Sequence, residues 1–64
     1  MSDEMNKVVD ISILNRYRLE DINHVFYIAE KEMTMLNDIK EYDLLGEKVK
    51  ITKSGNDWKM EVVK

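Results

Sequence analysis

The chain has 64 residues, a net charge of −3, and neither cysteine nor proline. This length allows one small domain over residues 1–64, and the lack of cysteine excludes a disulfide framework and fits a reducing compartment. No apolar run approaches the roughly 18 residues that a membrane-spanning helix needs, and the acidic first residues lack the pattern of a signal peptide. We therefore expect a cytoplasmic protein that does not bind membranes.

The size of the chain also favours self-association. A domain this small buries only about 60 % of the surface that its unfolded chain exposes. Small chains commonly gain stability from disulfides, a metal ion or oligomerisation. Because cysteine is absent and histidine occurs once, oligomerisation is the route that the composition leaves open. We expect a homodimer or a higher homo-oligomer.

The N-terminal part combines a polar end with a β-branched stretch. Residues 1–7 are polar and are expected to be disordered. Residues 8–14 alternate between apolar and polar side chains, which is typical of a half-buried strand. The apolar positions are Val9, Ile11 and Ile13, and the polar ones are Asp10 and Ser12. The alternative is a helix capped by Asp10, with Ile11 and Leu14 facing inward; the strand is favoured.

A long amphipathic helix is predicted over residues 16–45. Apolar side chains recur at steps of three and four, the spacing of one helical face; they are Leu19, Ile22, Phe26, Ala29, Met33 and Leu36. A second row beside them holds Val25, Ile28, Met35 and Ile39. No glycine or proline interrupts the segment, and Gly46 suits the left-handed residue that ends a helix.

This helix is too long to be covered by one small sheet. From Leu19 to Tyr42 it would measure about 36 Å at 1.5 Å per residue, whereas a seven-residue strand spans about 23 Å. Part of its apolar surface therefore requires a second copy or a partner. The residues predicted to mediate self-association are Val25, Ile28, Met33, Met35, Leu36 and Ile39.

The C-terminal part predicts a β-hairpin with strands at residues 47–53 and 58–63. Both segments alternate, and the residues between them are rich in turn formers. The apolar face holds Val49, Ile51, Trp58, Met60 and Val62, and it should pack on the helix because an isolated hairpin is marginal in water. The predicted fold is α+β, a β-α-β-β (or α-β-β) domain with one long helix on a C-terminal hairpin.

No residues predict catalysis, a metal or a cofactor. Glu20 and Asp21 lie one turn before His24, but a helical carboxylate metal site needs further ligands from other helices. A surface ion pair explains the three residues more simply. Glycine occurs only at 46 and 55, which excludes a glycine-rich phosphate loop. We expect a protein that is not an enzyme.

The remaining features favour binding to another protein. Tyrosines and an acidic helix side offer partner contacts, and the candidates are Tyr27, Glu30, Asp38, Glu41 and Tyr42. We expect a homodimeric adaptor, regulator or inhibitor that acts stoichiometrically on a larger, unidentified protein. Small acidic single-domain chains of this kind include phage-encoded inhibitors, which is an association rather than a derivation. The alternative is a nucleic-acid-binding regulator that uses Lys48, Lys50 and Lys59; the sequence pI of about 5.0 speaks against it.

Overall fold

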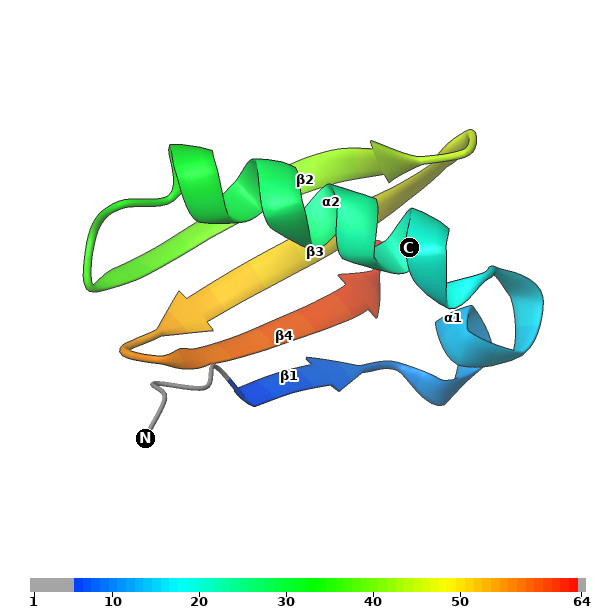
Figure 1. Cartoon of the computed structure of the whole chain (residues 1–64), viewed down its shortest axis with the longest axis horizontal. Coiled ribbons are helices and arrows are strands. Elements are labelled where there is room, and N and C mark those ends of the chain that lie inside the picture. Colours follow the sequence, from blue (N-terminus) through cyan, green and yellow to red (C-terminus); the bar gives the residue numbers. More distant parts are fainter. Residues whose placement is uncertain (1–5, 64) are drawn as a thin grey trace.

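One helix lies across one face of a four-stranded sheet, and no helix or strand of the described residues covers the other face (Figure 1). The computed structural model describes residues 6–63. The elements in chain order are β1 (Asn6–Val9), α1 (Ile11–Arg16), α2 (Leu19–Glu32), β2 (Asn37–Leu44), β3 (Glu47–Ser54) and β4 (Asp57–Val62). The α+β class is confirmed, with a long helix and a hairpin at the C-terminal end.

The sheet has the order β1-β4-β3-β2. Strands β2, β3 and β4 form an antiparallel meander, and β1 adds to β4 in parallel, with Val9 opposite Met60. The edges of the sheet are therefore the short strand β1 and the eight-residue strand β2. Figure 1 shows β1 and β2 on opposite sides of the β3–β4 hairpin.

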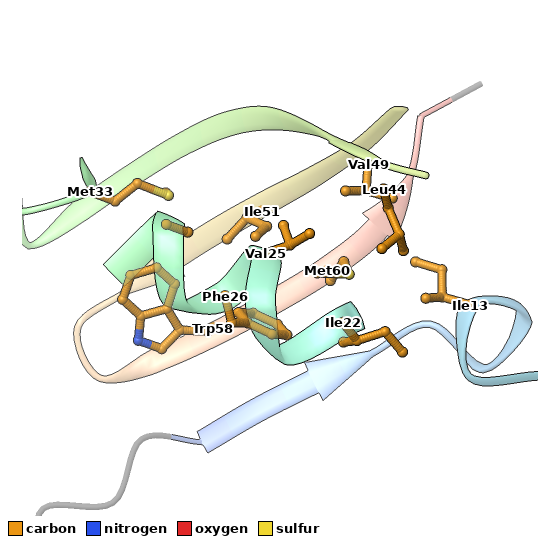
Figure 2. Packing of buried hydrophobic residues seen from close by; sticks show 11 residues of the cluster. Ile13, Ile22, Val25, Phe26, Met33, Leu44, Val49, Ile51, Trp58 and Met60 are labelled. Carbon is orange, nitrogen blue, oxygen red and sulfur yellow. The ribbon is translucent and has the colours of Figure 1, made fainter. Parts of the chain in front are cut away.

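The predicted hairpin is confirmed, and its apolar face lies under α2. Strands β3 and β4 pair from Ser54–Asp57 to Val49–Val62 around a two-residue turn at Gly55 and Asn56. Gly55 has φ of 63°, a left-handed conformation that glycine adopts at little cost. Alternation then places one set of side chains inward, and of these Val49, Ile51, Trp58 and Met60 are fully buried (Figure 2).

The inner face of α2 closes the core against this hairpin. Its buried residues are Ile22, Val25, Phe26 and Ala29, at the steps of three and four that place side chains on one side of a helix. Ile13, Met33 and Leu44 complete the cluster from α1, the end of α2 and β2 (Figure 2). The predicted helical stripe is thus the core face of α2 between Ile22 and Met33.

The prediction of one helix over 16–45 is wrong at both ends. Its last helical hydrogen bond is donated by the Met33 N–H to Ala29 O at 2.7 Å, and residues Asn37–Leu44 form β2 instead. Pairing with β3 gives the backbone of β2 a full antiparallel partner, and this outweighs the helical spacing of its side chains. Gly46 ends no helix; it lies in the two-residue turn between β2 and β3.

The prediction of a strand over 8–14 is also wrong after Val9. The Asp10 carboxylate accepts hydrogen bonds from the Ser12 N–H at 3.1 Å and the Ser12 hydroxyl at 3.2 Å, and α1 begins directly after it. This local cap stabilises a helix despite the β-branched residues. The alternative capped helix is right about Asp10 but wrong about its inner side, because Ile13 is buried while Ile11 and Leu14 are exposed.

Strand β1 begins earlier than predicted. Residues 1–7 were expected to be disordered, yet Asn6 and Lys7 belong to β1, where they lie opposite Asp57 and Trp58. The Asn6 side-chain amide donates a hydrogen bond to the Asp57 carboxylate at 3.0 Å. Backbone pairing with β4 thus orders Asn6 and Lys7, which are both polar. Residues 1–5 lie outside the described residues.

The turn between β2 and β3 contains an unfavourable residue, and Leu45→Asn should relieve it. Leu45 has φ of 50° and is followed by Gly46 at 96°. This is the geometry of the hairpin turn that prefers Asn-Gly, and a non-glycine side chain there costs about 1–2 kcal/mol. Leu45 is 70 % exposed, so little buried surface is lost. We expect the substitution to raise the free energy of unfolding by about 1 kcal/mol, measured in urea. An unchanged or lower stability would contradict this turn geometry.

Candidate protein-binding surfaces

The six residues predicted to mediate self-association do not share one surface. Val25 and Met33 are in the core, and Ile28 is half-buried on α2. Met35, Leu36 and Ile39 lie in and after the α2–β2 connection and are 65 %, 72 % and 58 % exposed. They were grouped by a helical spacing that ends at Glu32, and of the six only these three are exposed. We name Met35, Leu36 and Ile39 the 35–39 patch.

A second apolar surface lies on α1 and was missed from the sequence. Ile11 and Leu14 are both exposed, and being three residues apart they are neighbours on the helix surface. Ile13 between them points into the core, which turns both flanking side chains outward. The signal was present in Asp10 as a helix cap, but only the position of Ile13 settles which side is buried. We name Ile11 and Leu14 the α1 patch.

Glu47 ties the C-terminal end of α1 to the start of β3. The Tyr17 hydroxyl donates a hydrogen bond to the Glu47 carboxylate at 2.7 Å, and Arg16 forms an ion pair with the same carboxylate. The Tyr17 N–H bonds to Ile13 O at 3.0 Å and closes the helix. These contacts hold α1 against the sheet, so the α1 patch is presented on a fixed element.

The predicted partner-binding residues are divided among three places. Tyr27 is exposed on α2, with the Lys31 ammonium 4.6 Å from its ring centre, and Glu30 forms an ion pair with Lys7 at 3.3 Å. Asp38 and Tyr42 are half-buried on the side of β2 that faces α2. The fifth residue, Glu41, is exposed on the opposite side of the same strand. They are therefore not a single partner site.

Tyr42 packs against the edge of the core and binds α2. Its hydroxyl donates a hydrogen bond to the Glu32 carboxylate at 2.9 Å. Burial raises the pKa of Tyr42 from 10.0 to about 12, and the hydrogen bond and the negative charge of Glu32 add to the increase. The side chain is thus a connection between β2 and the end of α2 rather than a free anchor.

This pKa predicts how stability depends on pH. Because the pKa of Tyr42 is higher in the folded chain than in the unfolded one, its contribution is complete below about pH 10 and is lost as the pH rises towards 12. The difference in unfolding free energy between wild type and Tyr42→Phe should shrink over this interval, measured in urea. Glu32→Gln is the control and should lower the pKa of Tyr42 in an absorbance titration. A difference that stays constant from pH 8 to 12 would contradict the Tyr42–Glu32 contact.

The uncovered face of the sheet carries the nucleic-acid candidates. The side chains of Lys48, Lys50 and Lys59 all lie on this face. Glu61 lies among them, with its carboxylate 3.8 Å from the Lys50 ammonium and 3.1 Å from that of Lys59. The positive charge is therefore partly offset where the lysines meet.

The same face has two open hollows towards the end of the sheet at the β3–β4 turn. Their volumes are about 530 and 480 Å³, and Thr52 and Ser54 line both of them. Val8 of β1 lines the first and Ile39 of β2 lines the second. The exposed side chains of Val8 and Ile39 thus lie on either side of the polar residues Thr52 and Ser54, and the hollows are open to solvent rather than enclosed.

His24 is exposed on α2, and over residues 6–63 no three histidine or acidic side chains come together as a metal site would require. Within the same part of the chain, no helix has the length and apolar character to cross a bilayer. Comparison with known proteins found no matching family, no matching curated protein and no matching solved structure.

Proposed function

We propose that this protein is a small, cytoplasmic, non-enzymatic binding module that acts stoichiometrically as an adaptor, regulator or inhibitor of a larger protein, and that it works as a homodimer. The observation that carries this proposal is the two groups of exposed apolar side chains, the α1 patch and the 35–39 patch. Exposed apolar groups that gather on a small domain mark protein–protein contacts more often than they serve stability.

The positions of the two patches support a division of roles. The α1 patch follows β1, and the 35–39 patch leads into β2, and these strands are the opposite edges of the sheet. A domain that carries two separate apolar surfaces can contact a second copy through one and a target through the other. We assign the target to the α1 patch, because the contacts of Tyr17 and Arg16 with Glu47 fix the position of α1.

Affinity capture with matched variants tests the target contact. Immobilised wild type should retain one protein from its native lysate at a fixed molar ratio, and Ile11→Asp/Leu14→Asp should lose it. Tyr27→Ala, another exposed apolar position outside both patches, is the control and should retain it. Circular dichroism checks that each variant is folded. Retention by the α1 variant, or capture without a fixed ratio, would contradict the proposal.

Nucleic-acid binding is the second candidate, and the shared face of Lys48, Lys50 and Lys59 favours it. Contact with two or three phosphates would make the affinity fall with salt, with a slope of about −0.9 per phosphate in a logarithmic plot. Fluorescence anisotropy of a labelled duplex should then show binding by wild type that Lys48→Gln/Lys59→Gln abolishes. That result would displace the protein-binding proposal, whereas no binding at low salt would remove this candidate.

A further inference from the structure

Strand β2 presents a long hydrogen-bonding edge. It is the last strand in the sheet order, so its outer side has no strand partner among the described residues. The two-residue turn between β2 and β3 makes Leu44 and Glu47 a hydrogen-bonded pair. Along β2, residues that bond to β3 then alternate with residues whose backbone groups point away from it. The backbone groups of the odd-numbered residues therefore point outward. Accordingly, the Ile39 N–H donates to the neighbouring Asp38 carboxylate at 2.9 Å and not to β3.

Symmetry restricts how two copies could join along this edge. In an antiparallel pair of identical strands related by a two-fold axis, one residue lies directly opposite the same residue of the second copy, and the axis passes midway between the two. We call this residue the centre of the register. A residue that lies a given number of positions before the centre pairs with the residue that lies equally far after the centre in the second copy. The side chains of two paired residues lie on the same face of the sheet. Each candidate register of β2 is therefore defined by its central residue, and its charge pairs can be read from the sequence.

Only one register within β2 avoids like charges in opposition. A centre at Asp38, Lys40, Glu41 or Asp43 would place that charge opposite itself, and a centre at Tyr42 would place Glu41 opposite Asp43. Centres at the strand ends would leave most of the pairing outside Asn37–Leu44. A centre at Ile39 instead places Asp38 opposite Lys40 twice. It also places Ile39 opposite Ile39 and Asn37 opposite Glu41. Opposite charges across strands stabilise and like charges destabilise.

We propose that two copies of the chain join antiparallel along β2 with Ile39 on the two-fold axis, so that the two sheets become one. The occupant of this edge is a second copy because the charge pattern of Asp38, Ile39 and Lys40 is complementary to itself. The proposal rests on the homodimer of the proposed function and assigns its surface. It covers Ile39, and one step beyond β2 it brings Leu36 beside the second copy's Tyr42.

Single cysteines test the register directly, because the chain has none of its own. In this register, Ile39→Cys places two cysteines in a hydrogen-bonded pair with Cα atoms about 5.5 Å apart, within disulfide reach. Glu41→Cys is the control. Its cysteine lies opposite Asn37 of the second copy, and the two cysteines are about 14 Å apart along the strand direction. Mild oxidation should give a covalent dimer of the first variant and none of the second, measured by non-reducing gel electrophoresis.

Charge exchange tests the pairing of Asp38 with Lys40. Lys40→Asp or Asp38→Lys alone places like charges opposite each other at two points and should raise the dimer dissociation constant about tenfold or more. The double exchange Asp38→Lys/Lys40→Asp restores opposite charges and should recover the wild-type value to within about threefold. Sedimentation equilibrium measures the constants, and circular dichroism confirms that each variant is folded.

The outcomes separate this proposal from the proposed function. A wild-type dimer without the Ile39→Cys cross-link, or without rescue by the double exchange, would overturn the β2 register and leave the homodimer standing. A wild type that sediments as a monomer at millimolar concentration would overturn both. Loss of target capture by the α1 variant is measured separately and does not depend on β2. The cross-link together with the rescue would support the register.

Discussion

Phe26→Ala is expected to remove a large part of the free energy of unfolding of the chain. The Phe26 ring is fully buried at the centre of the inner face of α2, among the side chains of the hairpin (Figure 2). Replacing a buried phenylalanine with alanine costs about 3–5 kcal/mol. A chain of 64 residues at about 0.05–0.15 kcal/mol per residue has a total stability of about 3–10 kcal/mol. Urea denaturation followed by circular dichroism measures the loss.

The adjacent residue supplies the control for Phe26. Tyr27 is also aromatic but is 55 % exposed and contacts the ammonium of Lys31. Exposed substitutions usually change stability by less than about 0.5 kcal/mol, so Tyr27→Ala should leave the midpoint nearly unchanged. Similar losses at both positions would mean that α2 is rotated from the orientation described above.

Met33→Ala is expected to lower the free energy of unfolding by about 2–5 kcal/mol. The Met33 side chain is fully buried where α2 ends. Its carbonyl accepts a hydrogen bond from the Lys53 ammonium at 3.0 Å, and this contact survives the substitution because it involves the backbone. The loss therefore reports the side chain alone. Urea denaturation of a dilute sample separates it from any effect of self-association.

Met35→Ala is the matched control for Met33. Met35 is in the α2–β2 connection and is 65 % exposed, so its replacement in a dilute sample should cost less than about 0.5 kcal/mol. Equal losses at the two methionines would argue against the burial of Met33 and the exposure of Met35.

The C-terminal hairpin could be predicted because its signals are local and agree with one another. Val49 and Ile51 alternate with lysines, Trp58 and Met60 alternate with charged residues, and Gly55 lies in the turn between them. Strand periodicity and turn chemistry both pointed to the same element. The core face of α2 was predictable for the same reason, since Phe26 and its neighbours repeat at helical spacing.

The secondary structure of residues 33–45 could not be predicted from the local sequence alone. Gly46 adopts positive φ, and a glycine with positive φ ends helices and also makes two-residue hairpin turns. Met33 and Leu36 fit a helical repeat, while Tyr42 and Leu44 fit a strand with one buried side. The decision depends on β3, which lacks a partner on one side unless β2 supplies it. That is a tertiary effect, and it outweighs local preference.

The candidate surfaces were predictable only in part, because exposure depends on which element holds a residue. Met35, Leu36 and Ile39 were identified as a surface, although on a helix that does not reach them. The α1 patch was missed because Ile11 and Ile13 look equivalent in a strand, and in α1 they point in different directions. Apolar residues on short elements cannot be divided into core and surface until the element is known.

The parallel pairing of β1 with β4 has a consequence for how the chain folds during synthesis. The meander is joined by two-residue turns, so its strands meet rapidly, whereas Asn6 and Asp57 are separated by 51 positions. The entropic cost of closing a loop grows with the logarithm of its length, so the pairing of β1 with β4 is slower than the formation of the hairpins. Strand β1 leaves the ribosome before the other strands but has no neighbour in the sheet until β4 has emerged. The sheet is therefore completed only after its last strand has been translated.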